Sequence, residues 1–230
     1  MDCKNLVIMN KSFFFIARFR CLVVWALYVL MLLVLSPVAR AGAYEDFFKA
    51  IELDRAPMMQ SLLSRGFDPN TPDADGNSGL FVALRSGALR VADVLITHPQ
   101  LSVNAENEHG ETALMMAALK GWLEPAQRLL ARGARINKEG WTPLHYAATG
   151  PSTAMVTWLL DRGAAIEAPS PNGTTALMMA AMYGPETSAL ELMARGALLT
   201  SRNQLQMTAS DFATRAGRAS LAERLRPPGS

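Results

Sequence analysis

The feature that most constrains this chain is a short pattern that returns along it at a nearly constant spacing. The clearest copy reads G-W-T-P-L-H-Y-A-A from Gly140 to Ala148. The glycines that mark successive copies lie 34, 30 and 33 residues apart, at Gly76, Gly110, Gly140 and Gly173. A period near 33 residues indicates stacked supersecondary units, each too small to bury its apolar face alone. Such an array presents a long surface rather than a catalytic cavity.

The clearest copy has the local chemistry of a helix start. Thr142 places a hydroxyl acceptor at the N-cap position, and Pro143 follows at the first helical position, where its missing N–H costs nothing. Leu144, Ala147 and Ala148 come next at helical spacing, so they share one face. The two alanines let neighbouring helices approach closely. Glycines are expected to end the second helices in a left-handed conformation, at Gly133, Gly163 and Gly196.

The pattern resembles the ankyrin repeat, in which T-P-L-H-x-A-A is followed by L-L-x-x-G-A. Residues 142–148 match the first part completely, and two other copies read T-A-L-M-M-A-A, at 112–118 and 175–181. The resemblance covers roughly residues 44–225 and implies an all-α solenoid of about six helix-turn-helix units with short projecting β-turn loops. The expected units lie at about residues 44–75, 76–109, 110–139, 140–172, 173–205 and 206–225.

The expected units differ in regularity. The first lacks the Thr-Pro start, and the last has polar residues where inner copies are apolar, as expected for terminal units with one face in water. Six positions usually separate the end of one unit from the next turn glycine, as from Asn70 to Gly76, but only three separate Asn137 from Gly140. The loop between the third and fourth units is therefore expected to be shorter than the others.

Residues 1–41 have a different composition, typical of a secretory signal peptide. A basic start precedes an apolar run from Cys21 to Leu35, and Ala39-Arg40-Ala41 offers small residues for cleavage. The run is short for a membrane span, which needs about 20 apolar residues. We expect residues 42–225 to form an exported repeat domain located in the periplasm, followed by a short tail at 226–230. An uncleaved inner-membrane anchor and full secretion remain alternatives, and both Met1 and Met9 are candidate starts.

Charge and cysteine usage exclude several function classes. Residues 1–41 hold five of the 22 basic residues and one of the 20 acidic residues, so the remaining chain carries 17 basic and 19 acidic residues. A nucleic-acid surface would need clustered Lys and Arg, which are not present. Both cysteines, Cys3 and Cys21, lie in the first segment, so the rest has no disulfide and no cysteine metal site.

The sequence offers no catalytic constellation. His98, His109 and His145 share no metal-ligand spacing, and neither a G-x-S-x-G motif nor a phosphate-binding glycine loop is present. His145 stands at the motif histidine, and the resemblance implies that it makes hydrogen bonds within and between repeats. We therefore expect a non-catalytic, monomeric binding module with no cofactor and no metal. The expected partner is a protein of unknown identity.

The resemblance implies that partners meet the projecting turns and the concave face of the first helices. Positions after the turn glycines and at the ends of the first helices are therefore the candidate contacts. The apolar and aromatic members of this set form one expected strip, and aromatic side chains often anchor interfaces. The alternative for Trp141 is that it only packs on the neighbouring turn. The candidates are Asn77, Arg85, Glu111, Leu119, Lys120, Trp141, Met182 and Tyr183.

The methionines of the two T-A-L-M-M-A-A copies have more than one interpretation. Met115 and Met178 replace the motif histidine, and Met116 and Met179 follow them; apolar residues at this spacing are usually core. An adaptable binding surface and a copper site built on methionines are the alternatives. The function expected from the whole sequence is a protein-protein interaction scaffold. A secreted effector that binds host proteins, or a metal or redox accessory factor for a periplasmic enzyme, are the other hypotheses.

Overall fold

The computed structural model describes residues 42–227. The chain divides into two compact units, Met1–Asp46 and Phe47–Ser230. In the first unit, residues 42–46 are described and are helical. The predicted signal peptide and the last three residues of the predicted tail lie outside the described residues.

The described part of the second unit is built from helices. Residues 47–52 are helical, and helices α2 to α12 follow. Within residues 47–227 the β structure consists of two isolated bridges, Pro72 with Ser78 and Glu106 with Thr112. The all-α prediction is therefore confirmed. The helix bounds are α2 Ala56–Ser64, α3 Gly79–Ser86, α4 Leu89–Thr97, α5 Ala113–Lys120, α6 Leu123–Ala131, α7 Pro143–Thr149, α8 Thr153–Asp161, α9 Ala176–Met182, α10 Glu186–Ala194, α11 Ala209–Arg215 and α12 Ala219–Arg224.

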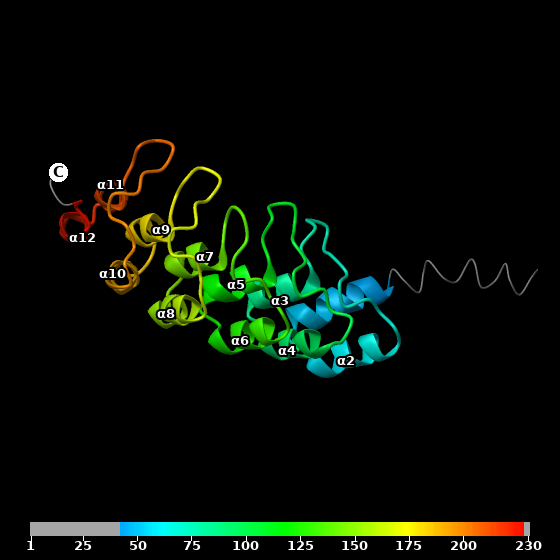
Figure 1. The fold of residues 1–230 in the computed structure, drawn as a ribbon. Coiled ribbons are helices and arrows are strands. Elements are labelled where there is room, and N and C mark those ends of the chain that lie inside the picture. The colour runs from blue at the N-terminus through cyan, green and yellow to red at the C-terminus, as the bar shows by residue number, and fades with distance from the viewer. Residues whose placement is uncertain (1–41, 228–230) are drawn as a thin grey trace, which may run out of the picture. The chain divides into compact units, whose positions relative to one another are not determined.

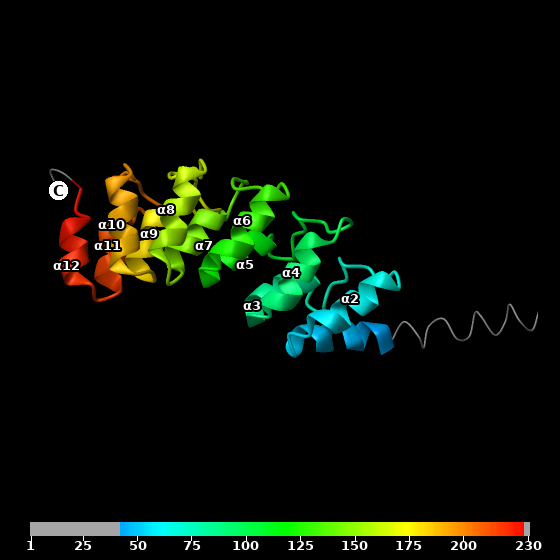
Figure 2. The same ribbon diagram turned by 90° about the horizontal axis from the view of Figure 1, so that it is seen from below.

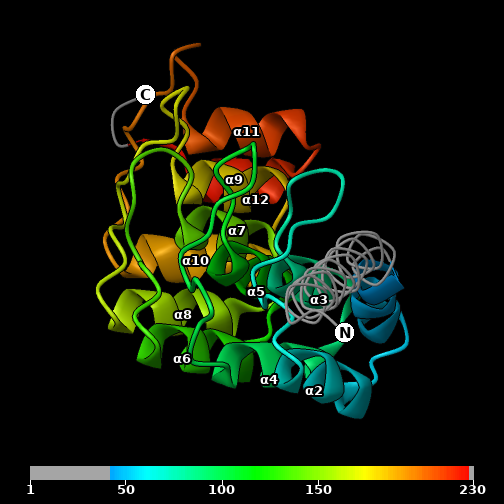
Figure 3. The same cartoon turned by 90° about the vertical axis from the view of Figure 1, so that its right-hand side faces the viewer.

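Within residues 47–227 successive helices pair along the chain, which agrees with the predicted number of about six units. Residues 47–52 precede α2, and contacts join α3 with α4, α5 with α6, α7 with α8, α9 with α10 and α11 with α12. The first helices of the pairs pack side by side in one row, formed by α3, α5, α7, α9 and α11 (Figure 1). The second helices form the other row, in which α2 contacts α4, α4 contacts α6 and α8 contacts α10 (Figure 2). The loops project together above the first-helix row in Figure 1, and Figure 3 shows the same loops from the side. The loops and the first helices therefore share one accessible side.

Small residues let the first helices pack closely. Ala117, Ala118, Ala147 and Ala148 are completely buried between neighbouring helices. A Cβ atom at Gly184, which follows α9, would overlap the carbonyl oxygen of Ala148. The end of α9 therefore approaches α7 at a distance that only a residue without a side chain permits.

Side chains at the ends of the repeats connect each unit to the next. Asn104 donates from Nδ2 to the Gly133 carbonyl at 3.0 Å and accepts at Oδ1 from the Arg135 N–H at 2.8 Å. Asn70 and Asn137 make the same two bonds one repeat earlier and one repeat later. In the next unit Glu167 replaces the asparagine and accepts from the Leu198 N–H at 2.8 Å. These residues form a ladder with one rung per repeat.

The loop between the third and fourth units is short, as the spacing predicts. It runs from Arg132 to Thr142, whereas the loop between α8 and α9 runs from Arg162 to Thr175. Asn137 keeps its place in the ladder. The missing residues therefore come from the projecting tip and not from the part that packs on the next repeat.

The last projecting loop has a strained residue at its tip. Gln206 adopts a φ of 61°, at the position where the preceding loop has Gly173 with a φ of 77°. Residues with a side chain pay an energetic cost in this left-handed conformation. Leu205 beside it is 72% exposed, so packing of the tip offers little compensation.

We expect the substitution N104A to lower the free energy of unfolding by about 1–2 kcal/mol, because it removes two hydrogen bonds between repeats. Urea denaturation followed by circular dichroism measures the change. The control is Q127A on α6, where Gln127 is exposed and its side chain makes no hydrogen bond within the described residues; this variant should stay within about 0.5 kcal/mol of the parent. Equal effects of the two substitutions would contradict a stabilising role for the ladder.

We expect Q206G to raise the free energy of unfolding by about 0.5–1 kcal/mol. Glycine removes the cost of the left-handed conformation, and part of this gain is offset by the greater freedom of the unfolded chain. The reciprocal change G173A should be destabilising, because a Cβ there would lie 3.3 Å from the Asn203 Cα. The same denaturation experiment measures both variants. A lower free energy of unfolding for Q206G than for the parent would contradict the claim that the backbone is strained at Gln206.

Candidate partner-binding face

A shallow apolar groove crosses three successive repeats on the side of the first helices. It has a volume of about 300 Å³. Its walls come from α5, α7 and α9, together with Trp141 in the short loop and Tyr183 at the end of α9. The lining residues are Leu119, Trp141, His145, Tyr146, Thr149, Met179 and Tyr183. The groove therefore brings together three of the predicted contact residues, Leu119, Trp141 and Tyr183.

The short loop places Trp141 at one edge of this groove. Its ring lies edge-on to the ring of His145, with 5.3 Å between centroids and an interplanar angle of 80°. The side chain is half-buried. Trp141 thus packs on the first turn of α7, as in the alternative interpretation, and it also forms part of the groove wall, as predicted for a partner contact.

Tyr183 and Met182 occupy different positions at the end of α9. Tyr183 is the C-cap residue and is 64% exposed, so most of its ring faces solvent beside the groove. Met182 is half-buried and does not line the groove. Met179, one turn earlier on α9, lines the groove instead of Met182. Sequence reasoning assigned Met179 to the core; the structure corrects this, since α9 turns that side chain toward the groove.

Tyr146 is a groove residue that the sequence analysis did not select. Its hydroxyl donates a hydrogen bond of 2.6 Å to Oε1 of Glu111, in the turn of the preceding repeat. Burial, the hydrogen bond to Glu111 and the charge of Glu111 all raise the pKa of Tyr146. The phenol is therefore protonated and fixed in position. The sequence feature that could have identified Tyr146 is its place at the variable position x of T-P-L-H-x-A-A. The same position in the fifth unit holds Met179, which also lines the groove.

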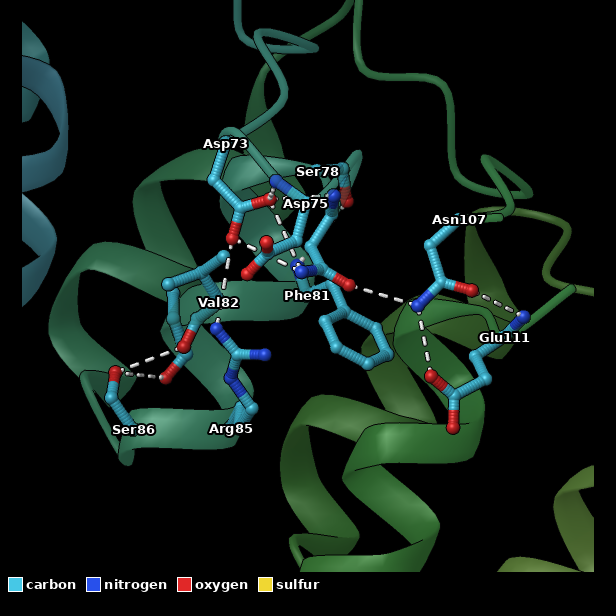
Figure 4. Close-up of polar contacts among 11 residues, drawn as sticks. Asp73, Asp75, Ser78, Phe81, Val82, Arg85, Ser86, Asn107 and Glu111 are labelled. Atoms are coloured by element: carbon cyan, nitrogen blue, oxygen red, sulfur yellow. Dashed lines mark hydrogen bonds and ion pairs between the residues drawn. The ribbon is translucent and has the colours of Figure 1, made fainter. Parts of the chain in front are cut away.

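Glu111 is held in a defined position by two neighbours. Besides the bond from Tyr146, its Oε2 accepts from Nδ2 of Asn107 at 2.8 Å. Asn107 also accepts the Glu111 backbone N–H at Oδ1, which closes a turn at the loop tip (Figure 4). Glu111 is half-buried, and no ion pair involves it within the described residues. Its carboxylate therefore lies uncompensated at the edge of the groove.

The predicted contact residue Asn77 has an internal role instead. It is only 5% exposed. Its Nδ2 donates to both carboxylate oxygens of Asp73 at 3.1 Å, and its Oδ1 accepts from Asn107 at 2.8 Å. This arrangement corrects the expectation that Asn77 faces a partner, because its side chain is used to connect two neighbouring loops.

The two predicted basic contacts, Arg85 and Lys120, lie at the ends of α3 and α5. Arg85 is exposed, pairs with Asp73 at 3.6 Å and lies 5.7 Å from the centroid of the Phe81 ring (Figure 4). Lys120 is exposed and makes no ion pair within the described residues. Neither side chain lines the groove, so both belong to its surroundings.

His145 has the structural role expected from its place in the motif. Its Nδ1 lies 3.2 Å from the Thr142 N–H and 2.8 Å from the Thr142 hydroxyl, so it acts as the acceptor. Its Nε2 lies 2.9 Å from the Thr174 carbonyl in the next repeat, so it carries the proton and donates. Thr142 is the N-cap residue of α7, as predicted, and forms a capping box with His145. Burial lowers the pKa of His145, and the bond to Thr174 partly offsets this effect.

In the third and fifth units a methionine stands in place of this histidine and keeps its contact with the threonine N–H. The Thr112 N–H points to the sulfur of Met115 at 3.4 Å, and the Thr175 N–H points to the sulfur of Met178 at the same distance. Both side chains are completely buried, and Met116 is also buried. The core interpretation is thus confirmed for these three methionines. Within residues 42–227 there is no group of three His, Cys, Asp or Glu side chains that could hold a metal ion.

The comparisons with known proteins agree with this architecture. A family model described as ankyrin repeats in three copies matches residues 47–139, 99–170 and 124–203. The human transient receptor potential cation channel subfamily A member 1 is 33% identical over 117 residues, which is 50% of this chain and 10% of the channel. The protein glp-1 of Caenorhabditis elegans is 29% identical over 193 residues, which is 77% of this chain and 15% of glp-1. This chain thus spans only a small part of these curated relatives.

A solved structure is similar to most of this chain. It is one chain of the complex of the Bd0816 predatory endopeptidase from Bdellovibrio bacteriovorus with the immunity protein Bd3460. The TM-score is 0.65 at 25% sequence identity, and the match covers 79% of this chain and 98% of that chain. The match therefore extends over a complete chain of similar architecture.

The fold is that of a helix-pair repeat protein, and the groove is assembled from three of its units. With the family model matching residues 47–203, the chain belongs to the ankyrin-repeat family. Ankyrin repeats are protein-protein interaction scaffolds. No helix within the described residues has the length and apolar character needed to cross a bilayer.

We expect acid to destabilise the protein through His145. Because burial lowers the pKa of this histidine in the folded state, the unfolded chain binds the proton more readily below its ordinary pKa of about 6.5. The contribution is therefore present above pH 6.5 and is lost as the pH falls through the lower pKa of the folded state. Urea denaturation between pH 7.5 and 5 should show this decline.

The substitution H145M introduces the residue that the third and fifth units already use. It should keep an acceptor for the Thr142 N–H, lose the bond to Thr174 at a cost of about 1–3 kcal/mol at pH 7.5, and flatten the decline in acid. The control H109Q changes an exposed loop histidine and should keep the parent profile. A parent-like decline in H145M would assign the acid sensitivity to another group.

Proposed function

We propose that this protein is an exported, non-catalytic binding module that captures a protein partner in the groove between α5, α7 and α9. The observation that carries the proposal is the groove itself, with Tyr183 64% exposed at its edge. Exposed aromatic rings beside apolar depressions are typical anchors of protein interfaces. The helix rows and the ladder hold the wall residues in place, so little conformational freedom is lost when a partner binds.

Export is the part of the proposal that depends on residues 1–41. Their basic start, apolar run and small residues before Gly42 support a signal peptide and a periplasmic location. Cell fractionation combined with N-terminal sequencing tests this part. A mature N-terminus near Gly42 in the periplasmic fraction is expected. An intact N-terminus in the membrane fraction would favour the anchored form, and recovery outside the cell would favour a secreted effector.

A second candidate is the control of an exported enzyme by direct binding. The observation in favour is the similarity to nearly all of one chain in the complex of an endopeptidase with an immunity protein. In this case the repeat domain would block or hold an enzyme without taking part in its chemistry. An accessory factor for a metal or redox enzyme would act in the same non-catalytic way. A hydrolase or a metalloenzyme trapped on the groove would support this candidate.

Site-specific photo-crosslinking in living cells tests the binding face. A photoreactive phenylalanine analogue at position 183 should trap a protein partner, because this side chain is exposed beside the groove. The matched control places the analogue at position 127, on the exposed face of α6 in the other helix row. Trapping of the same partners with equal yield at both positions would contradict the proposed face.

We expect Y183A to weaken the affinity for the trapped partner at least tenfold while leaving the melting temperature nearly unchanged. Tyr183 is mostly exposed, and surface substitutions usually change stability by less than about 0.5 kcal/mol. W141A should also weaken binding, with a moderate loss of stability because Trp141 packs on His145. Titration calorimetry and thermal unfolding separate the two effects. Unchanged affinity in both variants would show that the partner binds elsewhere.

A further inference from the structure

The proposed groove has an asymmetric electrostatic environment. On the loop side, Glu111 presents a carboxylate that is hydrogen-bonded to the groove residue Tyr146. Three more carboxylates without ion pairs in the described residues lie on the neighbouring loops, at Asp75, Glu108 and Glu139, and all three are exposed. Of the cations on these loops, Arg135 and Lys138 both pair with Glu106 at 2.9 Å. Arg132 instead donates to the Ile96 and His98 carbonyls at the end of α4. The loop side of the groove therefore has unneutralised negative charge.

Lys120 supplies a positive charge near the end of the groove that lies away from the loops, but its surroundings differ from those of Glu111. Lys120 is exposed on the last residue of α5 and makes no hydrogen bond or ion pair within the described residues. An ammonium on a long mobile side chain stays hydrated and loses freedom when it binds. Glu111 is already held by Tyr146 and Asn107 and is half-buried. A charge fixed in this way discriminates between partners more strongly than a mobile one.

We infer that the groove selects an extended partner segment in which a bulky apolar side chain is adjacent to a lysine or arginine. The apolar side chain enters between Leu119, Met179 and Tyr183. The neighbouring cation pairs with Glu111, whose two hydrogen-bonding neighbours leave it without a counter-ion. This inference rests on the proposed binding function and adds the chemistry of the segment that is recognised.

Three synthetic peptides of equal length provide defined probes. The first has a tryptophan flanked by lysines, the second a tryptophan flanked by glutamates, and the third an alanine flanked by lysines. The full-length chain carries ¹³C-methyl methionine, and the Met179 methyl signal reports occupancy of the groove, with the buried Met178 as an internal reference. The lysine-tryptophan peptide should shift the Met179 signal and bind about fivefold more tightly than each of the other two.

Matched variants assign the preference to Glu111. E111Q should bring the lysine-tryptophan and glutamate-tryptophan peptides to nearly equal affinity, whereas E108Q, which removes the same charge from an exposed loop residue, should keep most of the preference. Y183S should weaken both tryptophan peptides. If E111Q is poorly folded, the parent protein in high salt replaces it, because salt screens the charge and should remove the preference. An equal affinity of the parent for lysine-tryptophan and glutamate-tryptophan peptides would overturn the inference, as would unchanged discrimination in E111Q.

The outcome can be separated from that of the photo-crosslinking experiment. If position 183 traps a partner but the parent protein shows no preference for the lysine-tryptophan peptide, the chemistry inferred here is wrong and the proposed binding face stands. If the peptide preference depends on Glu111 but no partner is trapped, the groove chemistry is supported and the proposed cellular function fails. Absence of both effects overturns both.

Discussion

Close contact between the first helices of neighbouring repeats is the interaction on which the rest of the structure depends. No single helix pair encloses an interior, so each apolar face is buried only by the next pair. The completely buried alanines of α5, α7 and α9 allow this contact, and Gly184 extends it to the end of α9. A larger side chain at these positions would separate the helices and expose the buried leucines of the same helix faces to solvent.

This packing also determines where binding chemistry is possible. The alanine faces are used for helix contacts. In the fourth and fifth units this leaves the variable position after the motif histidine on the accessible side, and in the third to fifth units it leaves the end of the first helix there. Tyr146 and Met179 occupy the former position, and Leu119 and Tyr183 lie at or beside the latter. The groove therefore results from side chains that the repeat does not need for its own stability. Its polar edge has the same origin, because Glu111 closes its own loop with Asn107 and still has an oxygen for Tyr146.

Much of the fold could be predicted from the sequence because its signals are local. Proline and threonine at helix starts, and glycines after the second helices, act through their own backbone geometry; Gly133, Gly163 and Gly196 all have positive φ. The candidate site was predicted less completely, since exposure depends on contacts between repeats. Asn77 looked accessible because its bond to Asn107 joins positions 30 residues apart, in two different repeats. Met116 and Met179 stand at the same place in identical motifs, yet one is buried and the other faces the groove.

The short loop between α6 and α7 shows that two parts of a connecting segment are independent. Asn137 still spans to the next repeat, although the turn beyond it has lost residues. The segment thus consists of a spacer next to the helices, which makes the same bonds in successive repeats, and a tip whose length differs between repeats. Insertions or deletions in such tips can reshape the rim of the groove while the register of the helices stays the same. A lineage could in this way change the partners of the protein by altering loop lengths, without redesigning its interior.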